Sequence, residues 1–428
     1  MIKESLLIKN GRVVDPVSRT DAVKDVFVSG GKIAAISAGV GEQASQVIDA
    51  AGCIVMPGLV DMHVHLREPG REDKENVASG TSAAAKGGVT SVLAMPNTDP
   101  PMDSVENVAL FKRIIRCGAK VNVFISSAIT KGRQGEEPVA FDLLKKNGVV
   151  AFSDDGASVD SPEILLKALA KSREKGFLII CHSEDRNLSA GGTVNLGPVS
   201  TRLGLKGISA ESEYRRVERD IALAARAKAR VHIAHVSCAE SVKVIAEAKK
   251  KGIKVTAETA PHYFSLTEEA VLGYDTNMKM NPPLRRREDL EAVKKGLRDG
   301  IIDAIASDHA PHTENEKEIE FNLAEFGVTG LETELSVAVT ELVYGGVLDW
   351  MGLAEKMSFV PASILGIKKG DLREGRDADI VVFSPHEEWT VKREDFVSRS
   401  VNSCFLGRRL KGRVRYTICA GKTVYAAE

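Results

Sequence analysis

Eight short apolar runs, rich in β-branched residues, alternate with helical or loop segments and constrain the fold more than any other feature. They span residues 58–66, 90–97, 121–128, 148–155, 177–184, 231–237, 254–262 and 302–312. Strands of a parallel sheet that is buried on both faces have this composition. Between two runs, residues 161–176 carry helix signals, with Ser161 before Pro162 at the start and Gly176 at the end. The alternation predicts an α/β fold of the TIM type, a (β/α)8 barrel.

The two ends of the chain differ from this central part. Residues 1–55 and 368–428 contain short alternating runs between turn signals and little helical periodicity. Because the two ends resemble each other, we expect them to pair into one small β-sandwich domain. The predicted division is therefore a composite domain of residues 1–55 and 368–428 and a barrel of residues 56–367.

Charge and composition narrow the function classes. The formal net charge is −1 and no basic block occurs, which disfavours nucleic acid and anionic membrane as partners. The first residues lack the apolar core of a signal peptide, and no run is long and apolar enough to span a membrane. The six cysteines are scattered without a CxxC pair, as in a reduced, cytoplasmic protein. We therefore expect a cytoplasmic protein.

Polar residues with metal-binding side chains follow most of the predicted strands. In a barrel of this type the functional residues lie at the carboxyl ends of the strands. His63 and His65 are two apart on the first strand, so both side chains can face one side. His182 ends the fifth run, His235 the sixth and Asp308 the eighth. Imidazoles and a carboxylate without a thiolate set are typical of a catalytic zinc site.

Four histidines and one aspartate exceed the three ligands that a single zinc with an open position needs. This surplus indicates two metal ions, and two close ions require a bridging anion. The fourth run ends in Asp154 and Asp155, and alternation allows only one of them to point fully inward. Spacing leaves open which one it is, and the other would cap a loop.

Several neighbouring residues are expected to lie outside the ligand set. Cys181 adjoins His182 and is interpreted as a buried core thiol. By strand alternation, His232 and His309 should face away from the metal site. For His262 a supporting role beside the site and a purely structural role remain equally open.

With these residues in view, the chain resembles the amidohydrolase superfamily and, within it, dihydroorotases of the bacterial single-function type. The matching stretches run in family order along nearly the whole chain: GLVDMHVHLREPG, GGVTSVLAMPNTDPP, GVVAFSDDG, CHSED, HIAHVS, ETAPHY, MNPPL, DAIASDHAPH and EFGVTGLET. A bare HxH is shared by many relatives, whereas DHAPH together with HVHLREPG and MPNT is specific.

The resemblance implies a role for each ligand candidate. It assigns His63, His65 and Asp308 to one Zn²⁺, His182 and His235 to a second, and Asp155 with a hydroxide to the bridge between them. Hydantoinases and most allantoinases instead bridge their metals with a carboxylated lysine on the fourth strand. Asp308 would also carry the proton during catalysis.

The resemblance also implies a substrate site. Its residues would be His65, Arg67, Asn97, Asn281, His312, Phe326 and Gly327, with Arg67, Asn97 and His312 receiving the substrate carboxylate. A guanidinium can hold a carboxylate with two parallel hydrogen bonds. The family commonly has proline before Phe-Gly, but Glu325 stands there, and its effect on the loop is left open.

The implied reaction is the reversible cyclisation of N-carbamoyl-L-aspartate to dihydroorotate, the third step of pyrimidine biosynthesis. One alternative is another cyclic amidase, such as a hydantoinase (dihydropyrimidinase) or an allantoinase. Another is a non-catalytic barrel that serves as a scaffold for aspartate transcarbamoylase. The resemblance leaves a homodimer and a transcarbamoylase partner open.

Overall fold

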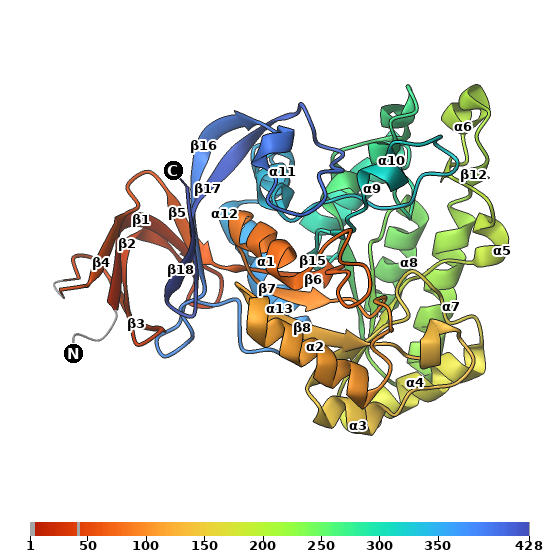
Figure 1. Cartoon of the computed structure of the whole chain (residues 1–428), viewed down its shortest axis with the longest axis horizontal. Helices are drawn as coiled ribbons and strands as arrows, with labels where there is room; N and C mark the ends of the chain where they lie inside the picture. Colours follow the sequence, from red (N-terminus) through yellow and green to blue (C-terminus); the bar gives the residue numbers. More distant parts are fainter. Residues whose placement is uncertain (1–4, 41–42, 428) are drawn as a thin grey trace.

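The computed structural model describes residues 5–40 and 43–427, which form a barrel and a separate sheet beside it (Figure 1). The barrel strands, in spatial order, are β6 (Leu59–Val64), β7 (Val89–Ala94), β8 (Asn122–Ser127), β9 (Val149–Phe152), β10 (Leu178–Cys181), β13 (Val231–Ile233), β14 (Val255–Thr259) and β15 (Ala304–Ile305). All adjacent pairs are parallel. The eight predicted runs therefore supply the eight barrel strands.

The barrel closes between its first strand and the segment that follows its last. Val64 and His309 form a parallel bridge, and the His65 N–H donates to the His309 carbonyl at 2.9 Å. Apolar side chains such as Met62, Leu93 and Ile180 fill the interior. The barrel is thus a packed core, and functional residues are expected at its carboxyl-end face.

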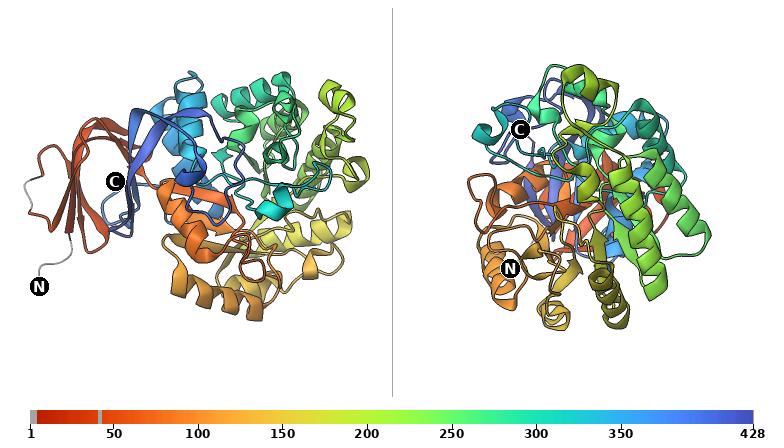
Figure 2. Two further views of the ribbon diagram at one scale, coloured as in Figure 1. Left: turned by 45° about the horizontal axis from the view of Figure 1, so that its top comes forward. Right: turned by 90° about the vertical axis from the view of Figure 1, so that its right-hand side faces the viewer.

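Helices surround the barrel, as the end-on view shows (Figure 2). The main ones are α1 (Val77–Lys86), α2 (Val105–Gly118), α3 (Phe141–Lys146), α4 (Pro162–Lys175), α7 (Glu211–Ala227), α8 (Ala239–Lys250), α9 (Arg287–Arg298), α11 (Glu334–Ala338), α12 (Trp350–Ala354) and α13 (Val360–Leu365). Helix α4 begins where Ser161 Oγ accepts from the Ile164 N–H, and it ends at Gly176 in a left-handed conformation. The residues predicted to begin and end this helix therefore cap it in the structure.

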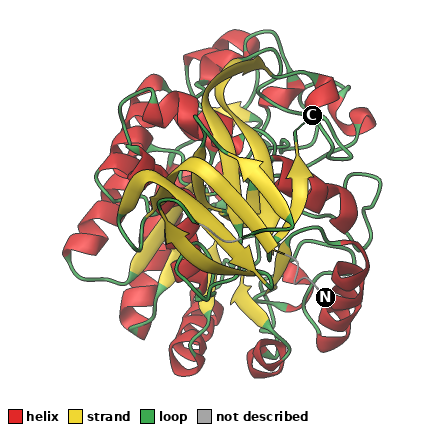
Figure 3. Cartoon of the chain, turned by 90° about the vertical axis from the view of Figure 1, so that its left-hand side faces the viewer, coloured by secondary structure: helices red, strands yellow, loops and turns green. Residues whose placement is uncertain are grey.

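The second sheet faces the viewer in Figure 3, and it joins strands from the two ends of the chain, which are red and blue in Figure 1. Its strands are β1 (Ser5–Asp15), β2 (Thr20–Ser29), β3 (Lys32–Ser37), β4 (Gln46–Asp49), β5 (Ile54–Pro57), β16 (Ile380–Thr390), β17 (Arg409–Cys419) and β18 (Lys422–Ala426). Strand β5 pairs with β1 on one side and with β16 on the other. The predicted fold class is confirmed, while the division at residues 55/56 and 367/368 remains a prediction.

Strand β6 contains an irregularity just before the metal-site candidates. Asp61 pairs with Val92 and Val64 with Ala94, so β6 has one more residue than β7 over this stretch. Such bulges commonly re-aim side chains next to active sites. The Asp61 carboxylate accepts from the backbone N–H groups of His63 and Ser307, at 3.0 and 3.2 Å. This contact fixes the end of β6 against the segment that carries Asp308.

Among the described residues, no helix is both long and apolar enough to cross a membrane.

Candidate metal centre and active site

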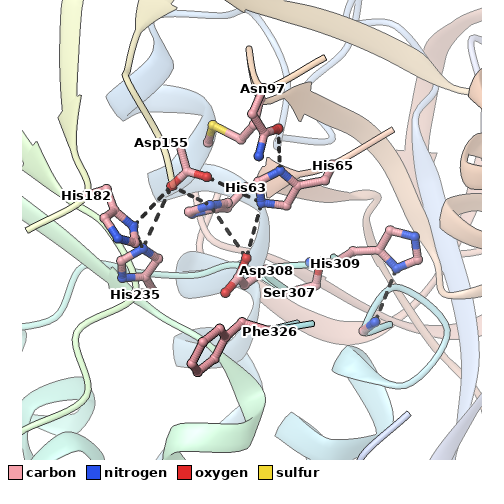
Figure 4. A network of polar contacts seen from close by, with 12 residues as sticks. His63, His65, Asn97, Asp155, His182, His235, Ser307, Asp308, His309 and Phe326 are labelled. Carbon is pink, nitrogen blue, oxygen red and sulfur yellow. Dashed lines mark hydrogen bonds and ion pairs between the residues drawn. The ribbon is translucent and has the colours of Figure 1, made fainter. Parts of the chain in front are cut away.

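Six predicted ligand residues converge at the carboxyl ends of the barrel strands (Figure 4). They are His63 and His65 on β6 and beyond it, Asp155 after β9, His182 after β10, His235 after β13, and Asp308 after β15. Asp155 lies between the histidines. Its carboxylate oxygens are 3.3 Å from His63 Nε2, 3.5 Å from His65 Nε2, 3.5 Å from His182 Nδ1 and 3.8 Å from His235 Nε2.

Asp308 faces the same two histidines that β6 contributes. Its Oδ1 atom lies 3.4 Å from His65 Nε2 and 3.6 Å from His63 Nε2. Asp308 and His235 both have positive φ angles, of 50° and 36°. Their backbones have therefore left the extended conformation, and strand alternation no longer determines where their side chains point.

The two adjacent aspartates of the fourth run have different surroundings. Asp154 accepts from the backbone N–H groups of Ile129 and Thr130 at 2.8 and 3.1 Å, and from the Thr130 hydroxyl. It therefore holds the loop that follows β8. Strand β9 ends at Phe152, so both aspartates lie in a loop where each can point in its own direction.

A buried carboxylate beneath the cluster orients His63. Glu258 on β14 contacts His63 Nδ1 at 2.7 Å and His232 Nε2 at 3.2 Å. This contact leaves His63 Nε2 free to face Asp155 and Asp308. His232 lies outside both candidate ligand groups, as expected, and its ring is connected to His63 through Glu258. His309 does turn away, toward Glu75 and the Gly330 N–H (Figure 4).

The electrostatics of the cluster favour positive charge at its centre. Burial alone would raise the pKa of Asp155, but His63, His182 and His235 outweigh it and hold that pKa well below its ordinary value. Burial likewise opposes charge on His63, yet Asp155 and Asp308 raise its pKa well above the ordinary value. A cation between Asp155 and Asp308 would be stabilised by the same two negative charges.

The donor set fits a metal centre. His63, His65 and Asp155 bring ligand atoms within 4.8 Å of one another, and so do Asp155, His182 and His235. Asp155 belongs to both groups, as a bridging ligand would. His63 Nε2 and Asp155 Oδ1 are buried and have no hydrogen-bond partner, which is costly unless another group engages them. Imidazole and carboxylate ligands of this kind suit zinc.

A cavity of about 350 Å³ opens onto the cluster. It is lined by all of the predicted substrate residues: His65, Arg67, Asn97, Asn281, His312, Phe326 and Gly327. Arg67 Nε donates to the Pro311 carbonyl at 3.2 Å, and its Nη2 lies 3.2 Å from His312 Nε2. Asn97 Oδ1 contacts His65 Nδ1 at 2.8 Å. The candidate carboxylate-binding groups therefore adjoin the candidate metal ligands.

Two further residues of the site were missed in the sequence. Arg133, in the loop after β8, lines the cavity and donates from Nη2 to the Asp155 carbonyl at 2.7 Å. Lys74 donates to His312 Nδ1 at 3.1 Å, while His312 Nε2 contacts the Phe326 carbonyl at 2.8 Å. Because lysine can only donate, His312 Nδ1 is the acceptor and the ring proton lies on Nε2, directed at the Phe326 carbonyl; Arg67 Nη2 therefore lies beside Nε2 without donating to it. The position of Arg133 in a strand-end loop was the only available signal for it.

Solved structures with the same fold identify the class of protein. L-hydantoinase (dihydropyrimidinase) from Arthrobacter aurescens aligns with a TM-score of 0.89 and 27% identity, covering 98% of this chain and 96% of its own. Dihydropyrimidinase from Brevibacillus agri aligns with a TM-score of 0.87 and 27% identity, over 99% and 95% of the two chains. The fold and the site define a cyclic amide hydrolase of the amidohydrolase superfamily.

Sequence relatives identify the family within this class. A dihydroorotase from Elusimicrobium minutum is 50% identical over 97% of this chain and 96% of its own length. One from Pelotomaculum thermopropionicum is 52% identical over 98% of both chains. The family model described as "Dihydro-orotase-like" matches residues 52–241. The chain belongs to the dihydroorotase family.

Proposed function

We propose that this chain catalyses the zinc-dependent, reversible cyclisation of N-carbamoyl-L-aspartate to (S)-dihydroorotate and water in pyrimidine biosynthesis. The observation that carries the proposal is the shared cavity, in which Arg67, Asn97 and His312 adjoin the His/Asp cluster. Dihydroorotate carries a carboxylate on a cyclic amide. In the cavity, candidate carboxylate-binding groups lie beside a candidate hydrolytic centre, which suits a substrate with both a carboxylate and a cyclic amide.

The metal site of the proposal uses all six clustered residues. His63, His65 and Asp308 would hold one Zn²⁺, His182 and His235 the other, and Asp155 would bridge them with a hydroxide. Bound zinc would supply a hydroxide nucleophile near neutral pH and polarise the amide carbonyl. Glu258 keeps His63 Nε2 directed at this position through its contact with Nδ1.

Asp308 moves the proton in the proposed mechanism. In the hydrolytic direction a water oxygen bonds to the ring amide carbon, and the ring carbon–nitrogen bond breaks. Asp308 takes the proton from the attacking oxygen and gives it to the leaving nitrogen. Burial would raise the pKa of Asp308, but His63, His65 and His235 outweigh it and hold the pKa far below its ordinary value. The carboxylate is thus ionised at neutral pH.

Arg67 provides the principal charge for the substrate carboxylate. Burial lowers its pKa to about 10, so the guanidinium remains protonated at neutral pH. Only one of its five N–H donors is committed to the Pro311 carbonyl. The remaining donors can form two parallel hydrogen bonds to a carboxylate. Asn281, Phe326 and Gly327 would complete the contacts to the ring.

The competing functions require different features. Hydantoin, dihydrouracil and allantoin lack the ring carboxylate, which would leave the buried charge of Arg67 without a partner. A scaffold protein that only supports aspartate transcarbamoylase would have no need for the complete His/Asp cluster. The proposal includes a cytoplasmic location. It is compatible with a homodimer and with an aspartate transcarbamoylase partner.

The test is a dihydroorotase assay in both directions on zinc-loaded protein, with dihydrouracil and allantoin as competing substrates. We expect dihydroorotate to be strongly preferred, about two zinc ions per chain, and no activity in Asp308→Ala. Higher activity on dihydrouracil or allantoin would overturn the substrate assignment. Absence of both activity and zinc would instead support the scaffold.

The carboxylate assignment makes a separate prediction for Arg67→Ala. Losing a charged hydrogen-bond pair of about 1.5–3 kcal/mol should raise KM for dihydroorotate at least about tenfold. Zinc content, measured by metal analysis on the same preparation, should stay unchanged. Loss of both zinc ions would contradict the assignment.

A further inference from the structure

Two lysines lie almost completely buried behind the 321–327 loop, which contains Phe326 and Gly327. Lys279 is 2% exposed and Lys317 is 3% exposed. Within the described part of the chain, neither forms an ion pair with a carboxylate; their hydrogen-bond acceptors are backbone carbonyl oxygens. Burying an ammonium without a counter-charge is costly. Two such groups side by side therefore require an explanation.

Each ammonium group is satisfied by three carbonyl oxygens. Lys279 Nζ donates to Phe321, Asn322 and Ala324 at 2.8, 3.0 and 2.6 Å. Lys317 Nζ donates to Glu325, Gly327 and Lys279 at 2.8, 3.1 and 3.4 Å. An ammonium has three N–H donors, so none is left over. Together the two lysines engage five carbonyls of one seven-residue loop.

The lysines also reach the part of the loop that faces the cavity. Lys279 Nζ lies 4.6 Å from the centre of the Phe326 ring, a cation–π distance. The Phe326 carbonyl contacts His312 Nε2, and the Gly327 N–H donates to the Lys279 carbonyl at 3.0 Å. A shift of the loop would therefore displace Phe326, Gly327 and the acceptor that orients His312.

We propose that Lys279 and Lys317 are positioning residues that hold the 321–327 loop in its substrate-binding shape and thereby orient His312. The inference rests on the proposed function for the identity of the substrate. It also accounts for Glu325, where the family commonly has proline. The Glu325 side chain is exposed, and Lys317 binds its carbonyl, so the loop is fixed through its backbone.

Burial opposes the charged form of both lysines. Burial and, after it, the proximity of Lys279 lower the pKa of Lys317 to about 7. Burial also lowers the pKa of Lys279. Apolar packing could order a loop at smaller cost, but it cannot fix five carbonyl directions. The arrangement therefore serves the geometry of the loop backbone.

The experiment compares Lys279→Met and Lys317→Met with the control Lys356→Met. Lys356 is half-buried and donates to the Ile302 carbonyl before β15, at the opposite end of the barrel. Zinc-loaded proteins are assayed for KM and kcat with dihydroorotate. Amide hydrogen exchange of the loop is followed by mass spectrometry, with helix α4 as an internal reference.

We expect both loop variants to raise KM about tenfold or more, with kcat within about threefold and zinc content unchanged. Loop exchange should accelerate while exchange in α4 stays the same. The control should match the wild type in all of these. Unchanged KM or unchanged loop exchange in both loop variants would overturn the proposal.

Two further measurements keep the test decisive. If the methionine variants do not fold, Lys279→Gln and Lys317→Gln retain two N–H donors and should give intermediate KM values; wild-type KM values would count against the proposal. In the unaltered protein, the 321–327 amides should exchange much more slowly than exposed loop amides, and fast exchange would overturn the inference. Absence of dihydroorotase activity in the wild type would refute the proposed function, while exchange would still decide whether the lysines hold the loop.

Discussion

Single carboxylates in this site have separate tasks even where they are close together. Asp154 holds a loop and Asp155 lies among four histidines, although the two are adjacent in sequence. Glu258 contacts His63 at Nδ1, and it also contacts His232, so it connects the two rings. The contact partners of each carboxylate therefore determine its role.

Glu258→Gln tests whether this carboxylate supports the metal site. An amide cannot accept equally from two imidazoles, so His63 should be less well oriented and less basic. We predict a 10- to 100-fold loss of zinc affinity, by analogy with other carboxylate–histidine pairs, measured by competition with a chelator of known affinity. The control is Glu334→Gln, which changes a buried carboxyl group outside the site. This variant should bind zinc with the affinity of the wild type. Equal affinities would refute the supporting role.

The sequence could specify some site residues but not others. His63 and His65 followed from alternation on one strand, and the strand-end positions of His182, His235 and Asp308 followed from the barrel. The choice between Asp154 and Asp155 did not follow, because both lie beyond the last hydrogen-bonded residue of β9. The role of His232 was hidden because it depends on contact with a neighbouring strand.

At the scale of elements, the 321–327 loop depends on the backbone of Gly327. Its φ angle is 126°, and a Cβ atom there would lie 2.7 Å from Ala310 Cβ and 3.2 Å from His312 Nε2. We predict that Gly327→Ala raises KM for dihydroorotate about tenfold through strain and displacement of the loop. Steady-state kinetics with metal analysis would measure the effect.

A matched control separates backbone strain from crowding. Gly273 has a φ angle of 106°, but a Cβ atom there would have no neighbour within 4 Å. Gly273→Ala should therefore lower stability slightly and leave KM unchanged. If both variants altered KM equally, the proposed crowding of His312 would be wrong.

Helix α11 carries a buried carboxyl group that should make stability depend on pH. Burial, followed by repulsion from Asp61, raises the pKa of Glu334 well above its ordinary value of 4.5. The folded protein therefore keeps a proton that the unfolded chain releases, and stability declines as pH rises from about 4.5 toward the folded pKa. Glu334→Gln should raise Tm by a few degrees near pH 8 and by less near pH 5. A Tm difference that is independent of pH would contradict this.

Element positions were more predictable than their irregularities. The limits of α4 followed from Ser161, Pro162 and Gly176, since each has a local physical role. The extra residue of β6 did not follow, because it is defined only by the register with β7. The contacts of Lys279 with the 321–327 loop did not follow either, because the lysine and the loop are far apart along the chain.

At the scale of the whole molecule, the candidate metal ligands connect opposite sides of the barrel. They lie on or just after β6, β9, β10, β13 and β15, so bound metal would link five of the eight strands. Without a cation, Asp155 and Asp308 remain buried with only imidazole rings beside them, and both carboxylates face His63. Metal binding should therefore stabilise the fold in addition to enabling catalysis.

Zinc removal by a chelator should consequently lower Tm. At a free zinc concentration 100 times its Kd, binding to the folded state alone contributes about 2.7 kcal/mol, which corresponds to a few degrees. Added zinc should restore Tm progressively with concentration, and scanning calorimetry would follow the change. Asp155→Ala removes the residue shared by both candidate ligand groups, so its Tm should respond much less to zinc. If the variant and the wild type responded equally, the stabilising metal would have to bind elsewhere, because no other described residue belongs to both groups.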